Sequence, residues 1–317
     1  MRLWGSNERH FKMISSLAQL ALRWRENREM RRWLTGFFAC FAVTAGAAFA
    51  SAQTTAAPDP VEHTYRTVDG VPLKAFVFAP ATASSGGRSP AILLFHGGGW
   101  AAGAPDWTFT NARRYAGIGM TAISVQYRLS TEKVSPIDAL ADVCGAFQWV
   151  RAQSSALRID PRRIAAHGVS AGGHLAAAAA TIGCGNTEGA FGTGGPDALL
   201  LWSPAVDVSK DGHFRRLLGG RAPVEAYSPV EHVRPRMPPV VIVQGDQDTL
   251  TPLSGARRFC ERVTAGGGRC DLQVYPGVGH LLTRNLKNQE DDFDPDPVAR
   301  DDGHAKQVAF IRSLWLR

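Results

Sequence analysis

One serine in this chain occupies a position from which it could act as a nucleophile. Ser170 lies in the run GVSAGG at 168–173, which matches the pattern Gly-x-Ser-x-Gly. An apolar stretch at 163–167 precedes the run and an alanine-rich stretch at 171–182 follows it, so a strand should enter the turn and a helix should leave it. Such a turn exposes the serine hydroxyl at a helix N-terminus, as acyl transfer requires. The alternative for this pattern alone is a tight turn with a capping serine.

A second motif supplies groups that could bind a developing negative charge. The run HGGGW at 96–100 follows the apolar stretch 90–95, which has the length of a central parallel strand. Successive glycines after a strand leave backbone N–H groups free to point at an oxyanion. We therefore expect the N–H groups of Gly98 and Gly99 to form an oxyanion hole with that of Ala171. Taken alone, three glycines would equally suit a flexible loop.

Candidates for the acid and the base follow two later strands. Active sites of parallel sheets lie at the carboxyl ends of the strands. Asp246 and Asp248 follow the expected strand 240–244, and His280 follows the expected strand 272–275. The order of nucleophile, acid and histidine is one that serine hydrolases use. At this point both aspartates remain candidates for the acid.

These motifs together resemble a known family. HGGGW, the run Tyr-Arg-Leu at 127–129 and GVSAGG are similar to the α/β-hydrolase serine esterases of the hormone-sensitive-lipase-like group. They are closer still to compact bacterial carboxylesterases and feruloyl-esterase-like relatives, from about Val61 to the C-terminus. The lipase-like group usually has Asp before the serine, where this chain has Val169, and this favours the compact esterases. The resemblance places the acid three residues after Gly245, at Asp248. Asp246 is then expected to cap the loop, with Asp246 as the acid left as the alternative.

Other histidines compete with His280 as the base. His167 and His174 fall on the strand and helix beside Ser170, where packing or capping is the stronger interpretation. His304 is expected to begin a helix behind an acidic loop, and His96 to brace the glycine loop. We therefore assign the base to His280.

Strand and helix patterns alternate along the chain. This predicts an α/β-hydrolase fold with a mainly parallel sheet, helices on both faces and a small lid insertion at 207–236. Asp69-Gly70 signals a hairpin between the first two strands. The expected strands are 61–68, 73–78, 91–95, 121–127, 163–167, 198–202, 240–244 and 272–275, and the expected helices are 111–118, 137–150, 171–182, 253–263 and 305–315.

The first 52 residues differ from the rest. Two arginines after Met30, an apolar stretch and the segment Ala-Ser-Ala at 50–52 predict a signal peptide at 30–52, with a retained membrane anchor as the alternative. Residues 1–29 are then a dispensable extension, and 53–317 a single catalytic domain. Cys40 lies too early for lipid attachment at the cleavage point. We expect a periplasmic or secreted protein without stable membrane insertion after cleavage.

Charge argues against a polyanionic partner. The chain carries +7, but residues 1–52 hold eight basic and three acidic residues, so the remainder has 27 basic and 25 acidic groups, a net of +2. No basic cluster with interleaved aromatics remains, so no nucleic-acid binding is expected. The acidic run at 290–296 lacks calcium-loop spacing and predicts a solvated loop. Neither a metal nor an organic cofactor is expected.

Export bears on the four cysteines that follow the leader. Cys260 and Cys270 flank a triple-glycine turn, and Cys144 and Cys184 fall on consecutive helices. In an oxidising compartment these two pairings are favoured, although four cysteines allow three connectivities and all four could be buried thiols.

The short stretch before His96 limits the substrate. It leaves hardly any room for a helical cap, so we expect an open site for a small-molecule ester with a short-chain or aromatic acyl group. Trp100 and Trp107 could line the pocket or simply pack. The alternatives to a serine carboxylesterase are a prolyl-type serine peptidase and a non-catalytic hydrolase-fold binding protein. The oligomeric state is not predicted.

Overall fold

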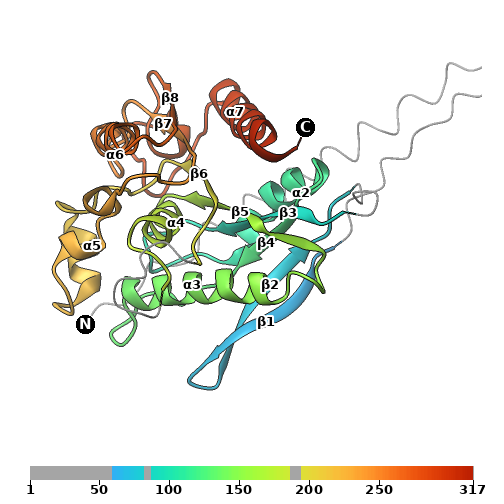
Figure 1. The fold of residues 1–317 in the computed structure, drawn as a ribbon. Helices are drawn as coiled ribbons and strands as arrows, with labels where there is room; N and C mark the ends of the chain where they lie inside the picture. The colour runs from blue at the N-terminus through green and yellow to red at the C-terminus, as the bar shows by residue number, and fades with distance from the viewer. Residues whose placement is uncertain (1–58, 82–86, 186–193, 317) are drawn as a thin grey trace, which may run out of the picture. The chain divides into compact units, whose positions relative to one another are not determined.

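The fold is built on one eight-stranded sheet, whose strands lie in the order β1-β2-β4-β3-β5-β6-β7-β8 (Figure 1). The computed structural model describes residues 59–81, 87–185 and 194–316. These residues belong to one unit, Thr55–Arg317. The expected extension at 1–29 and signal peptide at 30–52 lie outside the described residues.

The sheet is mainly parallel, as expected. Strand β2 pairs antiparallel with β1 and β4, and every other pair is parallel. Asp69 and Gly70, with φ of 50° and 78°, make the tight turn between β1 and β2. The strands are β1 Val61–Val68, β2 Val71–Phe78, β3 Ser89–Phe95, β4 Thr121–Val125, β5 Ile159–Val169, β6 Ala198–Trp202, β7 Val240–Gly245 and β8 Cys270–Tyr275.

Helices cover both faces of the sheet. Leu93 and Phe95 of β3 face a core built with α3, α4 and α6, while Ile92 and Leu94 face a core built with α2 and α7. All seven residues of β3 are therefore buried, which explains the unbroken apolar run from Pro90 to Phe95. The helices are α2 Phe109–Gly117, α3 Pro136–Ala152, α4 Ala171–Thr181, α5 Gly212–Leu218, α6 Leu253–Ala265 and α7 Pro297–Trp315, and the 3₁₀ turns are η1 Pro105–Thr108, η2 Val224–Tyr227, η3 Pro229–His232 and η4 His280–Leu282.

The last helix begins eight residues before the expected start at 305. Asp296 caps it through the backbone N–H of Ala299, and Pro297 occupies its first turn. Asp296-Pro297 is a start signal for a helix. It lies at the end of the acidic run at 290–296, whose composition predicts a loop. His304 is therefore inside α7 and not at its beginning, with its ring 4.4 Å from that of Trp202.

The insertion at 207–236 is tied to the helices beneath it. It contains α5, η2 and η3. Arg258 of α6 binds Asp207 at 3.0 Å and Glu231 at 2.6 Å, and Arg221 binds Asp138 of α3 at 2.6 Å. These ion pairs anchor both ends and the middle of the insertion.

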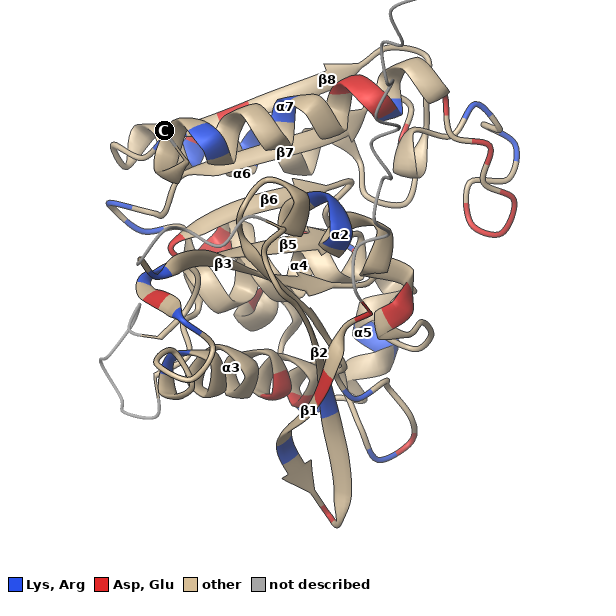
Figure 2. Cartoon of the chain, turned by 90° about the vertical axis from the view of Figure 1, so that its right-hand side faces the viewer, with Lys and Arg blue, Asp and Glu red and all other residues tan. Residues whose placement is uncertain are grey.

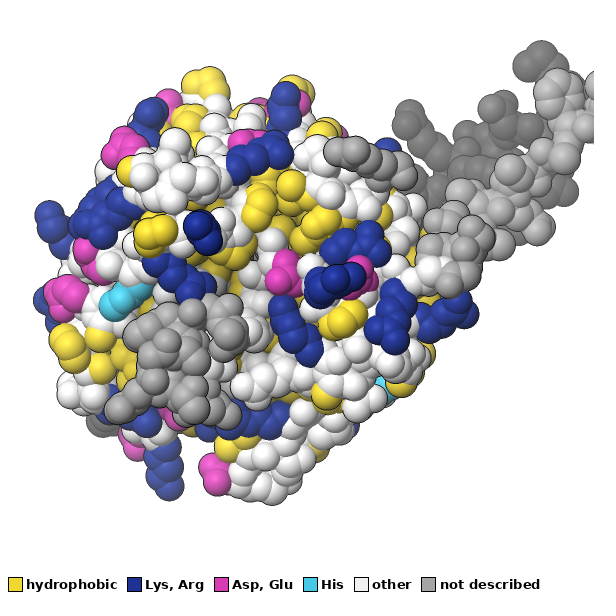
Figure 3. Space-filling model, in the orientation of Figure 1, with side chains coloured by type: hydrophobic (Ala, Val, Ile, Leu, Met, Phe, Trp, Pro, Cys, Tyr) yellow, Lys and Arg dark blue, Asp and Glu magenta, His cyan; other side chains and the backbone are white. Residues whose placement is uncertain are grey.

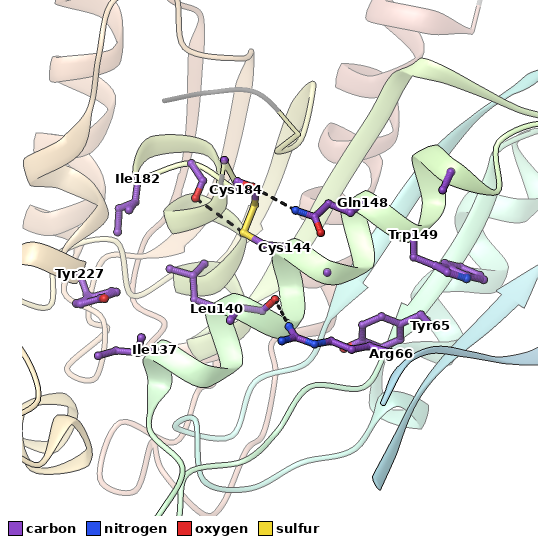
Figure 4. A pocket seen from close by; sticks show the side chains of 15 residues that line it. Tyr65, Arg66, Ile137, Leu140, Cys144, Gln148, Trp149, Ile182, Cys184 and Tyr227 are labelled. Atoms are coloured by element: carbon purple, nitrogen blue, oxygen red, sulfur yellow. Dashed lines mark hydrogen bonds between the residues drawn. A yellow bond between two sulfur atoms is a disulfide. The ribbon is translucent and has the colours of Figure 1, made fainter. Parts of the chain in front are cut away.

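Two disulfides link neighbouring elements, in the two pairings expected. Cys144–Cys184 joins α3 to the residues that follow α4, and Cys260–Cys270 joins α6 to β8. Figure 4 shows the first of these on the wall of a hollow beside α3, where Gln148 also donates to the carbonyl of Cys184 at 3.4 Å. None of the expected catalytic residues lines this hollow.

Charges of both signs are distributed over the surface. Helices α3 and α7 each carry basic and acidic residues (Figure 2). The face shown in Figure 3 has basic side chains spread over it, with acidic and hydrophobic ones between them. Within the described residues, no helix is both long enough and apolar enough to span a bilayer.

The disulfides should differ in their effect on stability because they close loops of different length. Cys144–Cys184 spans 40 residues and Cys260–Cys270 spans 10. Loop-closure entropy then predicts a loss of about 4 kcal/mol for the paired alanine substitution at 144 and 184, and about 3 kcal/mol at 260 and 270. Urea unfolding of the two oxidised variants against the parent measures both values. A larger loss at the 10-residue loop would contradict this entropic account.

Candidate active site

Ser170 sits in a strained turn between β5 and α4. Its φ and ψ are 52° and −117°, a region that costs a non-glycine residue about 1–3 kcal/mol. The turn is pressed against the end of β3: a Cβ added at Gly172 would come within 2.3 Å of the carbonyl oxygens of Phe95 and His96. Only glycine fits there, so the sequence pattern around Ser170 follows from this close approach.

The structure brings Ser170, His280 and Asp248 together. Nε2 of His280 lies 3.0 Å from Oγ of Ser170, and Nδ1 lies 2.9 Å from Oδ2 of Asp248. His280 is 3% exposed and Asp248 5% exposed. With Nδ1–H donating to the carboxylate, Nε2 is free to accept the serine proton.

Asp246 has a different partner. Its Oδ1 accepts the backbone N–H of Gly277 at 2.8 Å, which joins the loop after β7 to the loop after β8. This geometry agrees with the loop-capping role expected for Asp246, and the contact with the imidazole is made by Asp248.

Several donors that sequence analysis missed orient the Asp248 carboxylate. Oδ1 accepts the backbone N–H groups of Leu250 and Thr251, and Oδ2 accepts the Thr251 hydroxyl at 2.8 Å and the Gln244 amide at 2.9 Å. An Asp followed by Thr three residues later is a turn signal that could have indicated Thr251. Gln244 lies on β7 and carried no such signal. Together these bonds hold the carboxylate in one orientation toward His280.

Three backbone N–H groups near Ser170 are unpaired. Within the described ranges, no acceptor bonds the N–H of Gly98, Gly99 or Ala171. Gly98 has a φ of 108°, and a Cβ there would lie 2.3 Å from the carbonyl oxygen of Ala102. The glycine loop therefore needs glycine at this position to keep its shape. The expected oxyanion residues thus present free donors.

Comparison with known proteins shows the family to which this chain belongs. A family model described as the α/β-hydrolase fold matches residues 92–284. The chain belongs to the α/β-hydrolase family. A solved esterase from Thermogutta terrifontis, Est2, has 30% identity and a TM-score of 0.70, covering 81% of this chain and 93% of that one.

Curated relatives match in part. The "Carboxylesterase NlhH" of Mycobacterium tuberculosis is 37% identical over 120 residues, which are 37% of this chain and 35% of that protein. The "Carboxylesterase/phospholipase LipF" of the same organism is 26% identical over 255 residues, 70% of this chain and 64% of that protein. The matches thus span between about a third and two thirds of these relatives.

His96 braces the glycine loop of this α/β-hydrolase. Its ring stacks on that of Tyr127 at 4.3 Å, and the Tyr127 hydroxyl donates to its carbonyl oxygen at 2.8 Å. Nδ1 lies 2.7 Å from the carbonyl oxygen of Gly97. Burial lowers the pKa of His96, which favours a neutral ring that donates to Gly97. The bracing interpretation therefore fits the geometry.

Trp100 lies in the core and not on the pocket wall. It is 3% exposed, packs against Phe214 of the insertion and donates from Nε1 to Nδ1 of His174 at 3.2 Å. Nε2 of His174 in turn lies 2.8 Å from the carbonyl oxygen of Tyr227. His174 thus joins the nucleophile helix to both the glycine loop and the insertion. The packing alternative describes Trp100, whereas Trp107 is 62% exposed, with its ring 6.1 Å from that of His96.

His167 and His304 form no hydrogen bond with Ser170. Burial lowers the pKa of His167 to about 3, and its ring nitrogens have no hydrogen-bond partner in the described part of the chain. Burial, reinforced by the nearby Arg114, lowers the pKa of His304 to about 3 as well. Both rings are therefore held neutral, and neither contacts the serine hydroxyl.

The acidic run at 290–296 is exposed or half-buried, as expected, but the loop that carries it also contributes to the site. Its charged residues are exposed, but Gln289 is only 5% exposed and bonds to the backbone N–H of His280 at 2.8 Å. Phe293 is 42% exposed, with its ring 6.4 Å from that of His280. Phe293 lies within the acidic run and Gln289 directly precedes it, so the charges of the run gave no indication of either contact.

Stability should fall in mild acid because His174 is held neutral. Burial lowers its pKa to about 4, so the unfolded chain binds a proton that the folded chain does not. This stabilisation is present above the unfolded pKa of about 6.5 and is lost as pH falls toward 4, by about 1.4 kcal/mol per pH unit. His174→Gln, which keeps one donor and one acceptor, should flatten that slope in urea unfolding from pH 7 to 4. Identical slopes would contradict the prediction.

Proposed function

We propose that this chain is an exported serine carboxylesterase that hydrolyses short-chain or aromatic acyl esters. The observation that carries the proposal is the continuous contact from Ser170 through His280 to Asp248, at 3.0 and 2.9 Å, beside three unpaired backbone N–H groups. Those are the groups that acyl transfer needs: a nucleophile, a base with an oriented ring, and donors for an oxyanion. The signal pattern at 30–52 supports export.

In the first step, Oγ of Ser170 attacks the ester carbonyl carbon while its proton passes to Nε2 of His280. Asp248 stabilises the imidazolium through Nδ1–H, and the N–H groups of Gly98, Gly99 and Ala171 bind the oxyanion. Ala171 opens α4, so the helix dipole adds positive potential at the same point. Collapse of the tetrahedral intermediate expels the alcohol, which takes the proton from His280.

In the second step, water attacks the acyl-enzyme. His280 removes a proton from the water, the same N–H groups bind the second oxyanion, and the proton returns to Ser170 as the acid leaves. The proton transfers in both steps pass through Nε2 of His280, which lies 3.0 Å from Oγ of Ser170.

The acyl preference is supported by the surroundings of the site and by similar proteins. The insertion reaches the glycine loop, since Nε2 of His213 lies 3.0 Å from the carbonyl oxygen of Gly99. The half-exposed aromatic rings of Trp107 and Phe293 flank His96 and His280, respectively. Solved structures of Est2 are described as propionate bound and butyrate bound. We infer that small acyl groups fit this site.

Substitution of the three residues should rank them by role. Ser170→Ala should abolish ester hydrolysis and organophosphate labelling with the fold retained, and His280→Ala and Asp248→Asn should each lower turnover by several orders of magnitude. Asp246→Asn and His304→Ala are matched controls that should stay within about tenfold. Hydrolysis of p-nitrophenyl esters measures all five, and aminoacyl-proline amides test for peptidase activity. A larger loss at Asp246 than at Asp248 would reassign the acid.

Short acyl groups should be preferred. A groove that buried a longer chain would gain roughly 0.8 kcal/mol for each methylene. The insertion contacts the glycine loop through His213, which limits the room for such a groove. We expect kcat/KM to fall from acetyl or butyryl esters toward octanoyl esters, with a second optimum for aryl esters through Trp107 or Phe293. A steady rise to dodecanoyl esters would show a lipid-binding groove instead.

A further inference from the structure

A buried glutamine connects the loops that carry Asp248 and His280. Gln289 lies on the loop between η4 and α7 and is 5% exposed. Its Oε1 accepts the backbone N–H of His280 at 2.8 Å and that of Thr249 at 3.2 Å, while Nε2 donates to the carbonyl oxygen of Gln247 at 2.9 Å. One side-chain amide therefore bonds residues on both sides of Asp248 and the backbone of His280 itself.

The Gln289 side chain packs closely against the backbone of the residue before His280. A Cβ added at Gly279 would come within 2.4 Å of the Gln289 side chain, so the residue before His280 leaves space for the amide. A direct backbone bond, from Gln247 N–H to the carbonyl oxygen of Val278 at 3.0 Å, also joins the two loops. Gln289 adds the only side-chain amide, within the described residues, that bonds the backbone of both loops.

The loop at His280 needs such support because its backbone is not in a preferred conformation. Leu281 and Leu282, which follow His280, have φ of 54° and 63°. The left-handed region costs a residue with a Cβ roughly 1–2 kcal/mol, so surrounding contacts must hold the turn. Movement of this turn would displace the imidazole from Ser170.

The loop that carries Gln289 is held together by contacts between its two ends. A bridge pairs Thr283 with Pro295, and the Arg284 guanidinium binds both oxygens of the Asp294 carboxylate at 3.0 and 2.8 Å. Asn285 donates to the Asp292 carboxylate at 2.9 Å. These contacts close the loop on both sides of Gln289 and fix the direction from which its amide enters the site.

We propose that Gln289 is a positioning residue. It sets two distances, from the Asp248 carboxylate to the His280 imidazole and from that imidazole to Oγ of Ser170. The inference rests on the proposed esterase function. Reacting groups must be held within fractions of an ångström, and a displacement of about 1 Å can cost on the order of a hundredfold in rate. Gln289 acts through His280 and Asp248 and touches no substrate.

The test compares Gln289→Leu with Gln307→Leu. Gln307 is also fully buried and bonded to a backbone carbonyl, that of Leu201 at 3.2 Å, but it lies on α7 away from the triad. Both substitutions remove a buried amide of the same size, so both should lower the melting temperature. Only Gln289→Leu should lower kcat for p-nitrophenyl butyrate by tenfold or more at unchanged KM, with an equal slowing of organophosphate labelling.

Gln289→Asn is the second variant, used if the leucine variant does not fold. It keeps the amide but shortens its reach by one methylene, so the same loss of kcat is expected. If either folded Gln289 variant turns over as fast as Gln307→Leu, the positioning role is overturned. If the parent protein hydrolyses no ester at all, the proposed function fails first.

Discussion

The contact between Oγ of Ser170 and Nε2 of His280, 3.0 Å long, is the interaction on which the proposed chemistry depends. It joins residues 110 positions apart, and the bond from His280 to Asp248 adds a third segment. These residues follow β5, β8 and β7, which are parallel strands of one sheet. Because parallel strands end at the same edge, the loops that follow them can meet there.

Strand register places the two glycine-containing motifs beside one another. Phe95 of β3 pairs with Gly168 of β5, so HGGGW and the turn at Ser170 leave the sheet at the same level. The turn at Ser170 then fits so closely against β3 that a Cβ at Gly172 would lie 2.3 Å from the carbonyl oxygens of Phe95 and His96. The proposed oxyanion donors and nucleophile are therefore placed by backbone pairing, which is more rigid than side-chain packing.

Side chains complete what the backbone begins. His174 is bonded to Trp100 and to the carbonyl of Tyr227, so the glycine loop, the nucleophile helix and the insertion share one buried neutral ring. In the same way, Gln289 bonds the loop that carries Asp248 and the loop that carries His280. Each is a buried polar group with its hydrogen bonds satisfied, and such groups specify one arrangement because breaking any bond leaves an unpaired polar atom.

The sequence by itself determined the features that depend on local backbone requirements. The glycines around Ser170 and at 97–99, the apolar strands and the positions of Ser170 and His280 at strand ends follow from turn geometry and periodicity. These patterns were sufficient for the fold class and for two of the three residues that meet, whereas the choice of Asp248 over Asp246 came from the family resemblance. The Asp-Pro start of α7 was also visible, although the surrounding acidic run concealed it.

Only the tertiary structure decided which side chains complete the site. Two aspartates two residues apart have the same local signals, and their separate roles appear when Asp246 bonds Gly277 and Asp248 bonds His280. Trp100 became a core residue because Phe214 and His174 cover it. Gln289 lies 40 residues from Thr249, directly before a run whose charges predict exposure to solvent. Such contacts depend on how distant loops return to the same edge of the sheet, which no local pattern records.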